Sequence, residues 1–154
     1  EFDSMLLDIA TARNLGASGV VLGVLNPDST IDRDRTARLL DAARPLSVTF
    51  HRAFDEVPDP LAALETLQSL GIDRLLTSGC ARSAREGLNT LKSLVLASQS
   101  SPLILPAGRI CAEDLPSLAS LGLVECHVGS SVQNDGLTDA DLVRQFVKTA
   151  HDLP

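Results

Sequence analysis

The feature that most limits the fold of this chain is a regular alternation of amphipathic segments with short apolar runs. Each apolar run has the length and composition of a buried parallel strand. A spacing of roughly 20 to 30 residues between runs suits right-handed βα units. The runs are residues 19–25, 46–50, 74–77, 103–105 and 124–128. The alternation therefore predicts an α/β fold with about five parallel strands.

Helical segments fill the spaces between these runs, and several carry start or stop signals. Gly16, Gly71 and Gly122 each follow a helical segment, where glycine readily adopts the left-handed conformation that ends a helix. Asp59 and Pro60 suit an N-cap followed by proline in the first helical turn. The six expected helices are residues 2–14, 32–43, 59–70, 83–97, 112–121 and 139–150. The third is expected to bury Leu61, Leu64, Leu67 and Leu70.

Composition narrows the class of protein. The chain has 154 residues, 44% of them hydrophobic, with no Trp or Tyr, which predicts one domain over 1–154 with an aliphatic core. A net charge of −7 disfavours nucleic acid or an anionic membrane as a partner. No apolar run approaches the length of a membrane span, so we expect a cytoplasmic protein. Three widely spaced cysteines suggest reduced thiols.

Polar and ionisable side chains gather just after the apolar runs. The segment 47–55 illustrates this, because Val48 and Phe50 alternate with Thr49 and His51, and Arg52 and Asp55 follow. In α/β proteins, ligands bind at the carboxyl ends of the strands. The segments between helix and strand are brief and bland by comparison. Any ligand site is therefore expected at the carboxyl ends of the strands.

Two of these segments are specific enough to indicate a family. The run 49–55 (TFHRAFD) followed by 77–79 (TSG), together with 23–25 and the turn at 106–110, resembles the CutC family of copper homeostasis proteins. The resemblance extends over nearly the whole chain. It implies a TIM-type β/α barrel, here partial, because the chain corresponds to the helix after the third strand and then units four to eight. The N-terminal part of the family fold, with strands one to three, is expected to be lacking.

The resemblance also implies a connection with copper. The family's proposed copper ligands are cysteines of the N-terminal part, so they are absent from this chain and its metal ligands stay unknown. Cys80 lies at a strand end, Cys126 should point toward the helices, and Cys111 begins a helix. Cu(I) favours two or three converging sulfur ligands, and Met5 is the sole methionine. A copper site made of these cysteines is thus disfavoured.

The candidate site residues follow from their place after the strands. The candidate catalytic residues are His51, Arg52, Asp55 and His127, since an imidazole can exchange a proton near neutral pH and arginine can hold an anion. His51 could instead be structural, and Arg52 could simply pair with Asp55. Backbone N–H groups and hydroxyls could bind a phosphate or carboxylate at Thr77, Ser78, Gly79, Gly108, Arg109, Gly129 and Ser130; the alternative is a set of tight turns.

Three functions remain open at this point. The first is a CutC-like copper homeostasis protein that binds copper directly or through a partner. The second is a TIM-barrel enzyme of unassigned reaction that acts on a small anionic metabolite bearing phosphate or carboxylate. The third is an incomplete relative that functions only in an assembly. A five-stranded piece of a barrel leaves unpaired strand edges, so we expect either self-association into a homo-oligomer or an open, mobile sheet edge at 19–25.

Overall fold

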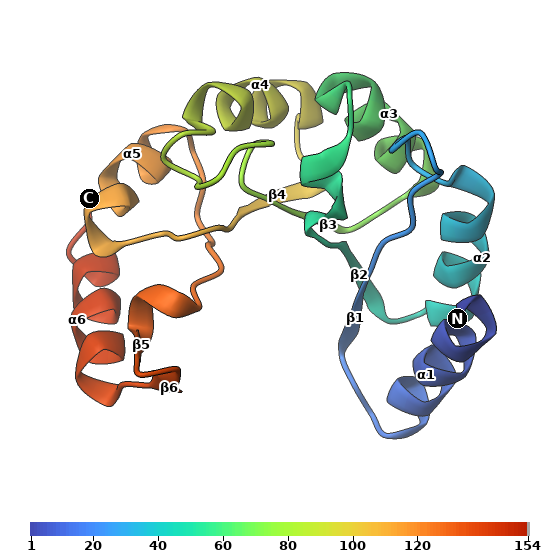
Figure 1. The fold of residues 1–154 in the computed structure, drawn as a ribbon, viewed down its shortest axis with the longest axis horizontal. Helices are drawn as coiled ribbons and strands as arrows, with labels where there is room; N and C mark the ends of the chain where they lie inside the picture. Colours follow the sequence, from blue (N-terminus) through green and yellow to red (C-terminus); the bar gives the residue numbers. More distant parts are fainter. Residues whose placement is uncertain (154) are drawn as a thin grey trace.

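The central element of the fold is a curved parallel sheet. The computed structural model describes residues 1–153. Four strands pair in the order in which they occur in the chain, and the helices lie along the outer, convex side of the sheet (Figure 1). They are β1 (Gly19–Leu22), β2 (Ser47–Phe50), β3 (Arg74–Thr77) and β4 (Leu103–Pro106). This arrangement is an arc of a β/α barrel, and it confirms the predicted α/β class.

Six α-helices accompany the strands, as the sequence predicts. They are α1 (Phe2–Asn14), α2 (Arg33–Ala43), α3 (Pro60–Leu70), α4 (Leu88–Ser98), α5 (Leu115–Ser120) and α6 (Ala140–His151). Short 3-10 turns are η1 (Arg52–Glu56), η2 (Ala112–Asp114) and η3 (Ser130–Val132), and a small antiparallel hairpin joins β5 (Gln133–Asn134) to β6 (Leu137–Thr138). Within residues 1–153, no helix combines the length and apolar content that a membrane crossing needs.

The helix signals in the sequence act as expected. The Asp59 carboxylate accepts hydrogen bonds from the Leu61 and Ala62 N–H groups and caps α3, and Asp32 caps α2 in the same way through Arg35 N–H. Gly71 ends α3 with a φ of +75°. These caps fix where the chain leaves each helix and enters the next strand.

The strand register separates the two faces of the sheet. Paired residues of a parallel sheet point to the same side, and Leu22, Phe50 and Leu75 form such a row. All three are at most 3% exposed and face the helices. Thr49 and Arg74 form the neighbouring row and therefore face the concave side. His51, two residues after Thr49, belongs to this concave side.

One predicted strand is wrong and another is too long. Residues 124–128 do not form a strand, because a single backbone bond, His127 N–H to the Pro106 carbonyl at 2.9 Å, joins them to β4. Val124 is 83% exposed, so little burial holds the segment in place. The strand predicted at 19–25 ends at Leu22, after which Leu25 bridges to Ile31 instead of continuing along β2.

Three helix predictions need correction. The helix predicted from 83 begins at Leu88. The segment before it packs against the loop after β3, where Gly79 and Gly87 lie so close that a Cβ on either would collide with backbone. The segment 112–121 divides into η2 and α5. Leu61, predicted to be buried, is 51% exposed because it lies in the first turn of α3, while Leu64 and Leu67 are buried.

Candidate functional site

The rim residues depend first on the 3-10 turn η1, which follows β2 directly. Val48 and Phe50 are fully buried against the helices, so Thr49 and His51 take the opposite side of the strand, as predicted. His51 is the N-cap of η1, and its Nδ1 atom accepts a hydrogen bond from Ala53 N–H at 3.1 Å. The turn then presents Arg52 and Asp55 three residues apart.

Asp55 joins η1 to the end of β3. Its carboxylate oxygens accept hydrogen bonds from Arg52 Nε at 2.7 Å, the Thr77 hydroxyl at 2.5 Å, the Ser78 N–H at 3.0 Å, the Ser78 hydroxyl at 2.8 Å and the Cys80 N–H at 3.1 Å. Its side chain is only 7% exposed. Because these donors saturate the carboxylate, its principal effect is to position the loop that follows β3.

Arg52 is anchored on two sides and open on the third. Its Nε donates to Asp55, and its Nη2 donates to the Ser78 hydroxyl at 3.0 Å. Its Nη1 has no hydrogen-bond partner among residues 1–153, and its side chain is 44% exposed. The two anchors hold the guanidinium plane, so Nη1 is an oriented and accessible donor.

The turn after β4 closes against this pair. Ala107 N–H donates to the Thr77 carbonyl at 2.8 Å, and Ala84 N–H donates to the Gly108 carbonyl at 2.9 Å. Gly108 has a φ of +95°, and a Cβ on it would lie 3.0 Å from Ser78 Cβ and 3.4 Å from Arg52 Cζ. The absence of a side chain at Gly108 therefore lets the backbone approach the guanidinium closely.

Seven of the eleven predicted site residues come together on this part of the rim: His51, Arg52, Asp55, Thr77, Ser78, Gly79 and Gly108. The others lie outside this contact network. Arg109 is exposed, and its guanidinium forms no hydrogen bond or ion pair with any of the seven. His127 reaches β4 through its backbone only, and its exposed ring has no partner in the described part of the chain. Gly129 and Ser130 are exposed at the start of η3.

Sequence reasoning missed two contributions to the rim. A Cβ on Gly23 would lie 2.7 Å from both Cε1 and Nδ1 of His51, so this glycine makes room for the imidazole. Arg85 Nε donates to Asp114 at 2.5 Å and ties the loop after β3 to η2, and Asp114 in turn raises the pKa of Arg85. For the first contribution, the only signal in the sequence was a glycine directly after β1. For the second there was none, because no local pattern indicates that residues 85 and 114 pair.

The cysteines do not form a metal centre in the described residues. No group of three or more His, Cys, Asp or Glu side chains is placed to hold a metal ion within residues 1–153. Burial, followed by the charges of Asp55 and Glu56, raises the pKa of the Cys80 thiol to about 11, and burial also raises the pKa of Cys126. A raised pKa disfavours the thiolate, which is the form that binds metals. These donors do not fit a resident copper ion.

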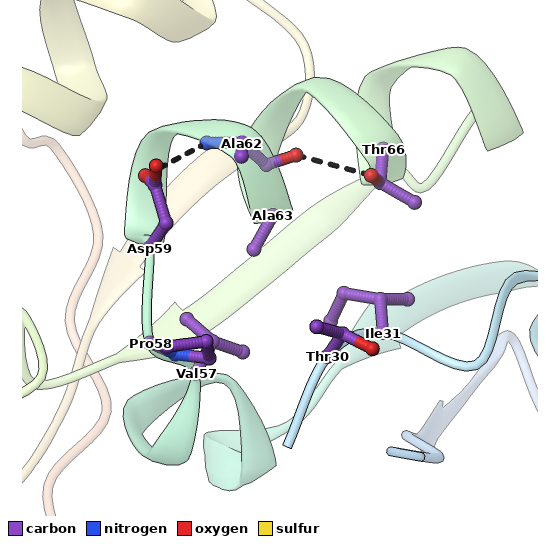
Figure 2. Close-up of a pocket in the computed structure, with 8 residues that line it drawn as sticks. All are labelled: Thr30, Ile31, Val57, Pro58, Asp59, Ala62, Ala63 and Thr66. Atoms are coloured by element: carbon purple, nitrogen blue, oxygen red, sulfur yellow. Dashed lines mark hydrogen bonds between the residues drawn. The ribbon is translucent and has the colours of Figure 1, made fainter. Parts of the chain in front are cut away.

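A separate apolar pocket borders the end of η1, and its volume is about 130 Å³. Figure 2 shows that its lining residues come from the segment after β1, the segment after η1 and the start of α3. Its polar atoms are already used, since the Asp59 carboxylate caps α3 and the Thr66 hydroxyl donates to the Ala62 carbonyl. It is lined by Thr30, Ile31, Val57, Pro58, Asp59, Ala62, Ala63 and Thr66. This pocket therefore offers no free donor to an anion.

The curved parallel sheet, its outer helices and the polar groups after β2, β3 and β4 define a partial TIM-type β/α barrel with a candidate site at the carboxyl ends of its strands. Comparison with known proteins agrees. The solved structure of a putative copper homeostasis protein CutC from Streptococcus agalactiae superposes with a TM-score of 0.77 at 29% identity, covering 82% of this chain and 62% of that one.

Sequence comparison identifies the family. A model of the CutC family matches residues 1–133. The mouse copper homeostasis protein cutC homolog is 43% identical over 136 residues, which is 88% of this chain and 50% of that protein. The family protein CutC of Klebsiella pneumoniae strain 342 is 44% identical over 127 residues, or 82% of this chain and 51% of that protein. The chain belongs to the CutC family, and it spans about half the length of these relatives.

Proposed function

We propose that this chain is the rim-bearing part of a CutC-type barrel and that it takes part in copper homeostasis by binding a small anionic ligand through Arg52. The observation that carries the proposal is the guanidinium of Arg52, which is fixed by Asp55 and Ser78 and leaves Nη1 free. A planar guanidinium is well suited to carboxylate or phosphate oxygens. The names of the relatives supply the connection with copper.

The charges near Arg52 limit the kind of ligand. Asp55 lies 2.7 Å from Arg52 Nε and balances its positive charge, so the rim does not hold a large excess of positive charge. The direction of Nη1 and the short distance between Gly108 and the guanidinium then select the ligand more than the net charge of the rim does. A singly charged carboxylate or phosphate ester suits this arrangement.

A titration with inorganic phosphate and with acetate tests the proposal. We expect saturable shifts in the ¹H–¹⁵N spectrum at residues 51–55, 78–80 and 107–109, and we expect Arg52→Gln to abolish them. Arg144→Gln is the matched control, because Arg144 also pairs with an aspartate three residues away but lies on α6 and is 74% exposed. Shifts that persist in Arg52→Gln, or their absence in the parent chain, would overturn the proposal.

Catalysis on the bound anion is the enzymatic form of this proposal. His51 precedes Arg52 at the start of η1, and its ring lies against Gly23 after β1, whereas the guanidinium of Arg52 lies against Gly108 after β4. The two side chains could therefore contact different parts of one ligand. His127, Gly129, Ser130 and Arg109 would then contact more distant parts of a metabolite. A larger phosphorylated or carboxylated compound that binds more tightly than inorganic phosphate, and that loses this advantage in His127→Ala, would support this extension.

Direct copper binding is the second candidate, suggested by the name of the mouse relative, a copper homeostasis protein cutC homolog. Metal content after dialysis against Cu(I), followed by competition with a chelator, tests it. A stoichiometric copper ion lost in Cys80→Ala or Cys111→Ala would place the metal on these thiols. We further propose that the protein resides in the cytoplasm, which cell fractionation tests.

A further inference from the structure

We infer that His51 is held as its neutral Nε2–H tautomer and acts as a hydrogen-bond donor to the ligand, not as a base or a metal ligand. The ring nitrogen Nδ1 accepts the Ala53 N–H at 3.1 Å. A backbone amide can only donate, so Nδ1 must carry a lone pair and the proton of the neutral ring must lie on Nε2. The tautomer follows from this contact alone, whereas the ligand role rests on the proposed function.

The same contact gives His51 a structural reason to keep this tautomer. It is the N-cap of η1, the turn that carries Arg52 and Asp55. Moving the proton to Nδ1 would set two donors against each other and leave the first turn without its cap. The imidazole tautomer is therefore coupled to the placement of the anion-binding guanidinium.

The ring orientation is fixed from two sides. A Cβ on Gly23 would lie 2.7 Å from Nδ1 and Cε1, so this edge of the ring rests against the backbone after β1. The Phe50 ring meets the imidazole edge to face, with centroids 5.8 Å apart and an angle of 62° between the planes. These two contacts hold the plane of the ring, and the Ala53 bond selects which edge carries the acceptor, because a half-turn of the ring would put Cδ2–H in place of Nδ1.

The Nε2 atom remains available to a ligand. It has no hydrogen-bond partner among residues 1–153. In the same part of the chain, the only side-chain polar atoms that are both buried and unpaired are Thr36 Oγ1 and Ser131 Oγ. The unpaired Nε2 therefore retains contact with solvent. An N–H group here adds a second donor to the rim, on the β1 side, whereas the Arg52 guanidinium lies on the β4 side.

Two other roles that histidines often have, metal ligand and general base, do not fit this geometry. A metal bound at Nε2 would require the proton on Nδ1, where it would face the Ala53 N–H, whereas metal-binding histidines direct that proton toward an acceptor. A general base at Nε2 requires the same unfavourable tautomer. A neutral imidazole donor instead stabilises negative charge on a ligand oxygen.

Long-range ¹H–¹⁵N spectroscopy of the imidazoles tests the tautomer without any ligand. At about pH 8, where an ordinary histidine is neutral, we expect His51 to give the signals of the pure Nε2–H form. His127 and His151 are exposed and lack side-chain partners in the described chain, so their signals should report a mixture of tautomers. An Nδ1–H form or an averaged signal at His51 would overturn the inference, whatever the ligand proves to be.

Substitutions then separate the cap from the donor. In His51→Asn the amide oxygen can replace Nδ1 as the acceptor for Ala53 N–H, but the side chain is too short to replace Nε2. We expect this variant to melt near the parent, with His151→Asn as the matched control. We expect His51→Ala to melt lower than both. A His51→Asn variant that melts as low as His51→Ala would contradict the capping role.

Phosphate binding gives the second readout. Loss of one donor to a charged oxygen should weaken binding of inorganic phosphate in His51→Asn by about tenfold or more. Unchanged affinity in this variant would overturn the donor role while leaving the proposed function intact. Absence of phosphate binding in the parent chain would instead overturn the proposed function, and the tautomer measurement would stand independently.

Discussion

The rim of the partial barrel has two parts that differ in how firmly they are held. Around β2, β3 and β4, the buried Asp55 carboxylate and the Arg85–Asp114 pair connect successive loops through side chains. The segment 124–128, in contrast, joins β4 through one backbone bond, and its Val124 is 83% exposed. A shared rim is therefore not enough to form a site; the connections between loops determine which residues are positioned.

Substitution of Asp55 should have the largest effect on this difference. Asp55→Ala removes an acceptor that five donors share and leaves the Thr77 hydroxyl and the Ser78 and Cys80 N–H groups unpaired, while the Ser78 hydroxyl keeps the Ala81 carbonyl. This should lower the free energy of unfolding by about 3 kcal/mol. The melting temperature should fall by about 6 to 12 °C. Thermal and urea unfolding both measure this.

Asp141→Ala provides the matched control for Asp55→Ala. Asp141 also pairs with an arginine three residues away, but its side chain is 90% exposed. Such a surface pair contributes little to stability. Equal effects of the two substitutions would show that the connection between η1 and β3 contributes nothing, and the distinction between the two parts of the rim would fail.

Gly108→Ala should destabilise the chain by about 2 kcal/mol, because the new Cβ meets strain from a positive φ and contact with Ser78. Gly122 separates the two causes: its φ is +80°, but a Cβ there would have nothing within 4 Å. Gly122→Ala should therefore cost about 1 kcal/mol, from backbone strain alone. Urea unfolding of both variants measures the difference, and a Gly108→Ala variant as stable as Gly122→Ala would argue against a close fit at Arg52.

The open edge of β1 offers a test at the other end of the sheet. Ser47 N–H donates to the Ser18 carbonyl, and His51 N–H donates to the Leu22 carbonyl. The backbone groups of the even-numbered residues therefore point toward β2, and the backbone N–H and C=O of Val21 point away from the sheet. The Val21 side chain is 63% exposed. We propose that the chain self-associates through this edge, as expected for an unprotected strand.

Val21→Lys should weaken that self-association about tenfold, since a charged side chain on an edge strand opposes pairing. Sedimentation velocity over a range of concentrations measures it. Leu96→Lys is the control, because Leu96 is similarly exposed, at 71%, but lies on α4. A parent chain that sediments as a monomer at all concentrations would contradict the role of this edge.

Sequence reasoning succeeded where the signal was local. The alternation at Val48 and Phe50 placed His51 and Arg52 correctly, and the caps at Asp59 and Gly71 set the bounds of α3. It failed at 124–128, which has a strand-like composition but too few partners. A strand is stabilised by hydrogen bonds to its neighbours, and no local pattern reveals whether those neighbours are present.

The rim contacts were predictable only in part. That Arg52 could pair with Asp55 follows from their spacing in the sequence. Asp55 also accepts hydrogen bonds from Thr77, Ser78 and Cys80, and these bonds depend on how β2 pairs with β3. The sequence indicates that the second strand follows the first, but not how the two align. The start of α4 was misplaced for the same reason, because it depends on the crossing of Gly79 and Gly87.

Alkaline pH tests the firmly held part of the rim through the Cys80 thiol. The pKa of Cys80 is raised from 9.0 to about 11, so the folded chain keeps this proton after the unfolded chain has lost it. Since the folded state then binds more protons, the stability from this group is complete below pH 9 and is lost as the pH rises toward 11. Unfolding measured across this range should show a decline that Cys80→Ala reduces. The same substitution at the exposed Cys111 should leave the decline unchanged. A decline in Cys80→Ala as large as in the parent chain would mean that the pKa of the Cys80 thiol is not raised by folding.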